Sequence, residues 1–227
     1  MIHHYNDRRD AGRALALYLV PYAGREDVTV LGLPRGGVPV AFEVAQGLGA
    51  PLDVLPVRPL VVPGRPELAV GAVAAGGVGF LDEGLVSRMG ISRRTVEAAV
   101  AGAEQELARM ELTYRADRPP LELVGRTVIL VDDGLTTSAT MRAAIAAVRR
   151  RGAARAVVAV PVAPPETCEE LAPLAEAVVC AAVPEAFVCI DSWYADFAPP
   201  TDDAIDDLLQ AAQRSRARAP APEQWLG

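Results

Sequence analysis

Short runs of aliphatic and β-branched residues alternate along this chain with segments of helical periodicity. Such strands, buried on both faces and separated by amphipathic helices, are typical of a parallel sheet in an α/β fold. The expected helices cover 38–47 and 138–151, and the expected strands cover 28–33, 52–58, 127–131, 155–162 and 177–181. The sequence therefore predicts a doubly wound, mostly parallel sheet that binds its ligand at the carboxyl ends of the strands.

The region 61–120 interrupts this alternation. Its first part, 61–81, is rich in Gly, Pro and Val and predicts a mobile loop that leads into a small hairpin. Residues 91–114 have the apolar spacing of a helix. We interpret 61–120 as an insertion into a single domain that spans 1–227 and ends in a loose tail at 214–227.

The composition excludes several classes of site. All 22 basic residues are arginines, so neither a phosphate-binding nor a Schiff-base lysine is available. The only histidines, His3 and His4, stand at the amino terminus, which argues against a Ser-His-Asp triad. The net charge of −7 argues against a nucleic-acid partner. Without a long apolar run or a secretory pattern, a cytoplasmic protein without a membrane partner is expected.

The segment 128–140 combines carboxylates, hydroxyls and a helix start. A buried strand ends in two acids, and a hydroxyl-rich turn opens the next helix: Asp132, Asp133, Thr136, Thr137, Ser138, Ala139 and Thr140. Free N–H groups at a helix N-terminus suit a phosphate, while paired carboxylates suit a vicinal diol or a hydrated divalent cation. This pattern predicts a ribose 5-phosphate site. The alternative is a structural turn with a Thr or Ser cap.

A second glycine-containing turn, 34–37, follows the first expected strand. Gly36 and Gly37 allow the backbone to approach a ligand closely, and Arg35 can bind phosphate oxygens through its guanidinium fork. Arg58 stands at the end of the next expected strand. These residues predict a site for a second, larger anion, although an ordinary turn with a surface arginine would have the same pattern.

Together the two segments resemble the type I phosphoribosyltransferases. The segment 128–140 is similar to the signature of that family, and 31–39 is similar to its pyrophosphate loop. The stretch 63–73 resembles a subgroup of uncharacterised bacterial phosphoribosyltransferase-like proteins, and this likeness extends over nearly the whole chain. The chain departs from the family at Ser138, where glycine is usual, and at Pro59, where a second basic residue is usual.

The resemblance implies a substrate and a role for each residue. The substrate is 5-phosphoribosyl-1-pyrophosphate with Mg²⁺, and Asp132, Asp133 and Arg35 are the implied catalytic residues. The 132–140 segment would bind the ribose 5-phosphate, and Arg35, Gly36, Gly37 and Arg58 would bind the pyrophosphate. Purine-salvage members carry an aspartate where this chain has Thr136, which disfavours hypoxanthine or guanine as the acceptor.

The segment 184–197 is similar to the late strand of the family. By that likeness Phe187 and Trp193 would contact the acceptor, and Asp196 would approach the Mg²⁺ ion. Core packing would explain both aromatic residues equally well.

We therefore expect an enzyme that transfers the ribosyl 5-phosphate group to a nucleobase or another nitrogen acceptor and releases pyrophosphate. Alternatives are a regulator that senses the ligand without catalysis, a hydrolase of phosphoribosyl pyrophosphate, or an enzyme that ribosylates a specialised metabolite. A homodimer stays open as an assembly. Because both aspartates are expected at the solvent-facing end of a strand, replacing either by asparagine should leave the fold intact.

Overall fold

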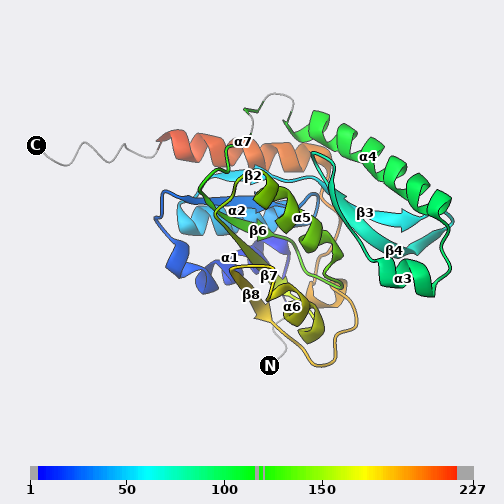
Figure 1. Cartoon of the computed structure of the whole chain (residues 1–227). Coiled ribbons are helices and arrows are strands. Elements are labelled where there is room, and N and C mark those ends of the chain that lie inside the picture. The colour runs from blue at the N-terminus through cyan, green and yellow to red at the C-terminus, as the bar shows by residue number, and fades with distance from the viewer. Residues whose placement is uncertain (1–4, 116–117, 120, 219–227) are drawn as a thin grey trace, which may run out of the picture.

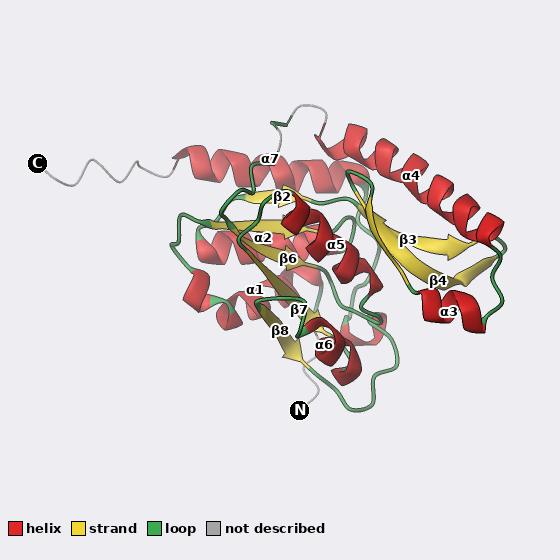
Figure 2. Ribbon diagram, viewed as in Figure 1, coloured by secondary structure: helices red, strands yellow, loops and turns green. Residues whose placement is uncertain are grey.

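The computed structural model describes residues 5–115, 118–119 and 121–218, and it contains a five-stranded parallel sheet. The strand order is β2-β1-β6-β7-β8. The strands are β1 (Val28–Gly32), β2 (Leu52–Val54), β6 (Thr127–Val131), β7 (Arg155–Val162) and β8 (Ala177–Ala182). The predicted α/β fold with a mostly parallel sheet is confirmed (Figures 1 and 2).

Helices cover both faces of this sheet. The helices are α1 (Arg8–Tyr18), α2 (Gly37–Leu48), α5 (Ala139–Arg150), α6 (Pro165–Leu171) and α7 (Asp202–Arg218). Alternate residues of β6 enter different clusters: Ile129 packs with α1, α2 and α7, whereas Leu130 packs with α5 and α6. Burial on both faces explains why these strands read as continuous apolar runs.

A second, antiparallel sheet projects from the main body, on the right in Figure 1. It consists of β3 (Val57–Val62), β4 (Arg65–Ala74) and β5 (Val78–Leu81), and is accompanied by α3 (Glu83–Arg88) and α4 (Arg93–Arg115). Leu60 and Val73 of this sheet pack against Ala103 and Leu107 of α4. This small separate core gives the insertion a folded structure of its own.

Three expectations from the sequence are wrong in detail. The stretch 61–81 is largely strand rather than a loop leading into a hairpin: the expected hairpin is there as β4 and β5, but β3 pairs with β4 in place of the loop, and both pack on α4. The predicted strand 52–58 is two strands in different sheets, separated at Leu55-Pro56. The predicted loose tail begins too early, because α7 continues through 214–218; the rest of that tail, 219–227, lies outside the described residues.

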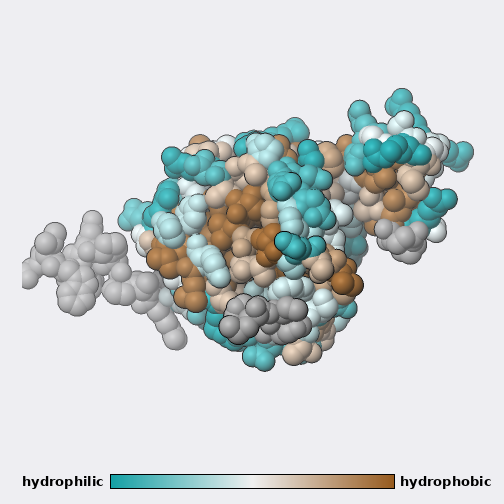
Figure 3. All heavy atoms as spheres, turned by 90° about the horizontal axis from the view of Figure 1, so that it is seen from below, coloured by the Kyte–Doolittle hydropathy of each residue, from teal (hydrophilic) through white to brown (hydrophobic). Residues whose placement is uncertain are grey.

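One face of the main body, seen from below in Figure 3, carries a patch of hydrophobic residues surrounded by polar ones. The edge strand β8 is half-buried along its whole length. In the part of the chain that the structure describes, no helix combines the length and apolar character needed to cross a bilayer.

Candidate functional site

The two segments singled out in the sequence meet at one edge of the parallel sheet. β1 and β6 are neighbours, with Gly32 opposite Val131, so both strands end at the same level. Beyond this point the Leu33 N–H donates to the carbonyl oxygen of Val131 at 2.9 Å. The loop after β1 is therefore hydrogen-bonded to the end of β6, where Asp132 begins the second loop.

Gly36 and Gly37 are required by this close approach. A Cβ on Gly36 would lie 2.0 Å from Asp133 Oδ2, and one on Gly37 would lie 2.5 Å from the carbonyl oxygen of Val131. The peptide bond between Pro34 and Arg35 is cis. The predicted pyrophosphate loop and the predicted acid pair are thus in direct contact, which neither segment alone could show.

Asp133 is buried beneath this edge, contrary to the expectation that both aspartates face solvent. It is 8% exposed, and its Oδ2 accepts a hydrogen bond from Arg8 Nε at 2.7 Å. Arg8 also donates to the carbonyl oxygen of Ala198, and its guanidinium lies 3.8 Å from the centre of the Phe197 ring. The Tyr194 hydroxyl donates to the carbonyl oxygen of Asp133 at 2.5 Å. Asp133 is therefore a structural anchor of the loop, with its charge already balanced.

Asp132 remains partly exposed and forms no ion pair among the described residues. Its Oδ1 accepts the N–H of Asp133 at 2.9 Å. Removal of water by the surrounding protein, and then the neighbouring Asp133 carboxylate, raise the pKa of Asp132 well above its ordinary value. Of the two aspartates, Asp132 is the one available to accept hydrogen bonds from a ligand.

The hydroxyl-rich turn leads into α5 as predicted. Thr136 and Thr137 are exposed, and Ala139 and Thr140 lie half-buried in the first turn of the helix. Ser138 is buried, and its Oγ donates to Glu170 Oε2 of α6 at 2.5 Å. Because the Ser138 side chain is hydrogen-bonded to α6, it does not cap the first N–H groups of α5, which have no partner within the helix.

Arg35 and Arg58 line one cavity of about 360 Å³, together with Pro34, Glu106, Arg109 and Met110. Arg35 is exposed, and its Nε lies 2.9 Å from Asp202 Oδ1 at the start of α7. Asp202 also accepts a hydrogen bond from the Tyr114 hydroxyl and lies 3.5 Å from Arg109. The Tyr114 hydroxyl first, and then Arg35 and Arg109, lower the pKa of Asp202. The structure thus brings the two predicted arginines together and adds a third.

The segment 184–197, predicted to contact the acceptor and Mg²⁺, contributes its aromatic side chains to a hydrophobic cluster. Trp193 is buried and Phe187 half-buried in a cluster with Tyr5 and Tyr194, so Trp193 has little surface on which to stack an acceptor. Asp196 is exposed and accepts the Ala198 N–H at 2.9 Å. Across the described residues, no three His, Cys, Asp or Glu side chains gather where they could hold one metal ion together. Asp196 therefore does not form a three-carboxylate site with Asp132 and Asp133.

The residues that the sequence interpretation missed are Arg8, Arg109, Tyr114, Tyr194 and Asp202. Most of them stand far along the chain from the loops that they contact. Asp7 has the character of a helix N-cap, and this local pattern could have predicted that a helix begins at Arg8.

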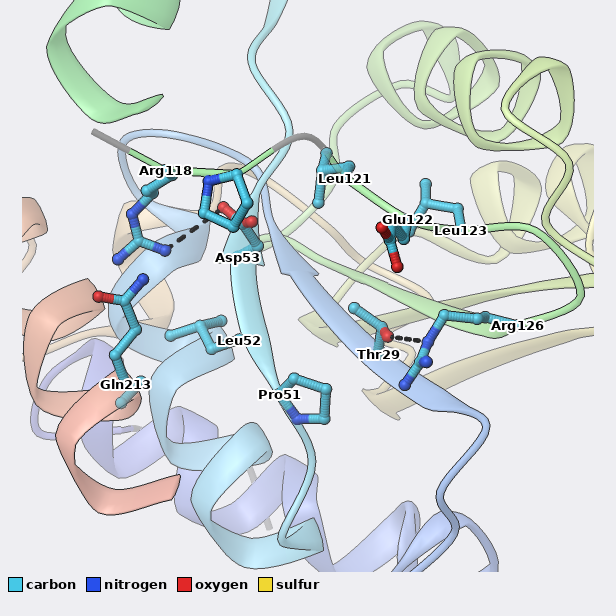
Figure 4. Close-up of a pocket in the computed structure, with 12 residues that line it drawn as sticks. Thr29, Pro51, Leu52, Asp53, Arg118, Leu121, Glu122, Leu123, Arg126 and Gln213 are labelled. Carbon is cyan, nitrogen blue, oxygen red and sulfur yellow. Dashed lines mark hydrogen bonds and ion pairs between the residues drawn. The ribbon is translucent and has the colours of Figure 1, made fainter. Parts of the chain in front are cut away.

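Another cavity, of about 440 Å³, lies elsewhere (Figure 4). It is lined by Thr29 and Arg126, near the amino ends of β1 and β6, and by Asp53 of β2. Arg118 borders it, 3.5 Å from Asp53, with its Nη2 buried without a hydrogen-bond partner. Because none of the predicted site residues lines this cavity, it is separate from the strand-end site.

Comparisons with known proteins show which family this chain is similar to. A family model described as "Phosphoribosyl transferase domain" matches residues 64–190. A protein of Mycobacterium tuberculosis (strain CDC 1551 / Oshkosh), named "Putative phosphoribosyl transferase MT0597", is 43% identical over 217 residues, which are 96% of this chain and 49% of that protein. This chain thus spans about half the length of the curated relatives that it matches.

Solved structures show the same architecture. TT1426 from Thermus thermophilus is 43% identical and superposes with a TM-score of 0.76, covering 92% of this chain and 98% of that one. The AQ2163 protein from Aquifex aeolicus is 15% identical with a TM-score of 0.51, covering 90% and 85%. The second likeness supports the fold alone.

Proposed function

The chain belongs to the phosphoribosyl transferase domain family, and on that premise we propose that it binds 5-phosphoribosyl-1-pyrophosphate with Mg²⁺ and transfers the ribosyl 5-phosphate group to a nitrogen acceptor. The observation that carries the proposal is the contact between the two loops, where Gly36 leaves no room for a Cβ against Asp133. One ligand with a phosphate at one end and a pyrophosphate at the other would engage both loops at once.

The described residues suggest which group binds where. The backbone N–H groups at the start of α5, with Thr136 and Thr137 beside them, would bind the 5-phosphate. Asp132 would accept hydrogen bonds from the ribose hydroxyls. Arg35 and Arg58, which border one cavity, would bind the pyrophosphate.

The reaction would form a bond from the acceptor nitrogen to C1 of the ribose as the bond from C1 to the pyrophosphate oxygen breaks. The bonding pair leaves with pyrophosphate, and the acceptor releases its proton to solvent. Positive charge that develops on the sugar would be stabilised by the carboxylate of Asp132, and negative charge on the leaving group by Arg35 and Arg58. The arrangement can thus favour both halves of a displacement at C1.

The residues at this edge fit a Mg²⁺ ion that is bound mainly through the phosphates of the substrate. Asp133 is already paired with Arg8 at 2.7 Å, so the chain offers few free carboxylates at this edge. Mg²⁺ is commonly held by one or two carboxylates together with substrate phosphates. When bound there it would neutralise charge on the pyrophosphate. Asp132 is the carboxylate of the loop without an ion pair among the described residues, and Asp196 is a second candidate.

The proposal is tested by two measurements on the whole chain. Saturating phosphoribosyl pyrophosphate with Mg²⁺, at a hundred times its Kd, should stabilise the fold by about 2.7 kcal/mol. Pyrophosphate release should then depend on an added nucleobase or amine from a screened panel. A melting temperature that saturating ligand leaves unchanged would contradict the proposal.

The same assay separates the alternatives. Release without any acceptor indicates a hydrolase, and stabilisation without release under any condition indicates a sensor. The parent with ribose 5-phosphate in place of the full substrate serves as the control, since it fills the phosphate loop but has no leaving group.

A further inference from the structure

Three arginines from separate elements converge on the cavity of about 360 Å³ beside the glycine loop. Arg35 follows β1, Arg58 stands near the start of β3, and Arg109 belongs to the last third of α4. Arg109 is the member that the sequence patterns do not indicate. Its position means that the insertion, through β3 and α4, supplies two of the three cations.

The charges of this cavity are only partly balanced. Arg109 binds Glu106 through two nitrogens, at 2.9 and 3.1 Å, and approaches Asp202 at 3.5 Å. Arg35 pairs with the same Asp202. Arg58 forms no ion pair within the part of the chain that the structure describes. The pKa of Glu106 is lowered mainly by its hydrogen bonds from Arg109, and further by the nearby charge of Arg58. Three guanidinium groups therefore share two carboxylates, which leaves a local positive excess in a chain of net charge −7.

The carboxylates of Asp202 and Glu106 occupy the guanidinium edges that phosphate oxygens would use. Carboxylates and phosphates bind the arginine fork in the same bidentate geometry. Side chains here are accessible: Arg35 is 43% and Arg109 45% exposed. Surface ion pairs contribute only about 0–1 kcal/mol each, so a multiply charged anion could displace them at little cost.

We propose that Arg109 is a third pyrophosphate-binding residue, and that Asp202 and Glu106 are the carboxylates that pyrophosphate displaces from Arg35 and Arg109. This inference rests on the proposed function and deepens it. The pyrophosphate then links the parallel sheet, through Arg35, to the insertion, through Arg58 and Arg109. A chain without lysine thus completes the subsite with an arginine from its inserted helix.

The test is calorimetric titration of inorganic pyrophosphate and, separately, ribose 5-phosphate into four proteins. These are the parent, Arg109→Ala, Asp202→Asn and Arg93→Ala. Arg93 is the matched control, because it lies on the same helix, is 92% exposed and pairs only with Glu97 among the described residues. Circular dichroism of each variant checks the fold, and Arg109→Gln, which keeps most of the side chain, is the second variant if Arg109→Ala does not fold.

Loss of one charge-assisted contact should weaken pyrophosphate binding by Arg109→Ala about tenfold. Binding of ribose 5-phosphate should stay unchanged. Asp202→Asn should bind pyrophosphate several times more tightly than the parent, because Arg35 and Arg109 lose a competing carboxylate while the amide can still accept from Tyr114. Arg93→Ala should behave as the parent with both ligands.

Each contrary outcome has a distinct meaning. If the parent binds pyrophosphate and Arg109→Ala binds it equally well, Arg109 is not part of the subsite, and the proposed function stands. If Asp202→Asn binds pyrophosphate more weakly than the parent, Asp202 does not compete with the ligand. If the parent does not bind pyrophosphate in the titration and is not stabilised by phosphoribosyl pyrophosphate with Mg²⁺ in the melting test, the proposed function itself is contradicted.

Discussion

Two ion pairs lie at the same edge of the parallel sheet, and they differ in exposure. In the pair Arg8–Asp133 the side chains are 10% and 12% exposed, whereas in the pair Arg35–Asp202 they are 43% and 31% exposed. A desolvated pair is strongly coupled to folding, because removing one partner leaves a buried charge without compensation. An accessible pair can exchange partners at little cost. The first pair therefore holds the loop in place, whereas the second is accessible and is the pair in which we propose that pyrophosphate replaces the carboxylate.

The largest effect is expected for Asp133→Asn, which leaves the buried guanidinium of Arg8 without its counter-charge. Breaking such a pair costs about 3 kcal/mol, and in a chain of this size that lowers the Tm by roughly 6–12 °C. Thermal unfolding followed by circular dichroism measures the shift. Glu97→Gln is the control, since its pair with Arg93 is exposed and should be nearly neutral. Equal shifts in Tm for Asp133→Asn and Glu97→Gln would show that the buried pair Arg8–Asp133 stabilises the fold no more than the exposed pair Arg93–Glu97 does.

A smaller effect, on binding rather than on stability, is expected for Arg35→Ala. Loss of its charge-assisted contact should weaken binding of phosphoribosyl pyrophosphate by about 1.5–3 kcal/mol, or roughly ten- to a hundredfold. Ribose 5-phosphate lacks the pyrophosphate and should bind almost as it does to the parent. Titration of both ligands by calorimetry checks this. Equal losses for both would place Arg35 at the 5-phosphate or indicate a general disturbance of the fold.

The smallest effect is expected for Asp132→Asn, and its sign is opposite to that of Asp133→Asn. In the unfolded chain the Asp132 carboxyl loses its proton as the pH rises above its ordinary pKa of 3.8. In the folded protein its pKa is raised, so the carboxyl keeps the proton to a higher pH. The stability linked to this proton is complete below pH 3.8 and is lost as the pH rises through the folded pKa. The neutral amide removes this loss, so the Tm should rise at pH 8, by ~2–4 °C for each ~1 kcal/mol recovered.

Near pH 3.5 the two proteins should melt at similar temperatures, and the ribosyl ligand should bind the variant more weakly at pH 8. A variant less stable than the parent at pH 8 would show that the Asp132 carboxylate stabilises the fold.

Much of the parallel sheet could be predicted from residue patterns. The strands 127–131 and 155–162 have the predicted bounds, because continuous Val and Ile runs have few alternatives in an α/β chain. The helix predicted at 91–114 is α4, offset by one or two residues. The loop expected in 61–81 was wrong, because β4 contains Pro66, Gly71 and three alanines, which strands usually lack, and its strand conformation depends on pairing with β3 and β5.

The candidate site divides in the same way. The local order of two acids, a hydroxyl-rich turn and a helix start predicted, from sequence alone, a turn into a helix after β6, and the structure has that turn. The glycines of 36–37 likewise marked a close backbone approach. Such features depend on neighbouring residues, so local chemistry is sufficient to predict them.

Tertiary structure alone decided which charged groups are fixed and which are free. Asp132 and Asp133 are adjacent and chemically identical, yet the approach of Arg8, 125 positions away, neutralises only Asp133. Arg35 meets its carboxylate in Asp202, 167 positions away, and shares it with Arg109 of the insertion. Desolvation and ion pairing depend on what the folded chain places around a group, so the sequence could identify the charged residues of this site but not their partners.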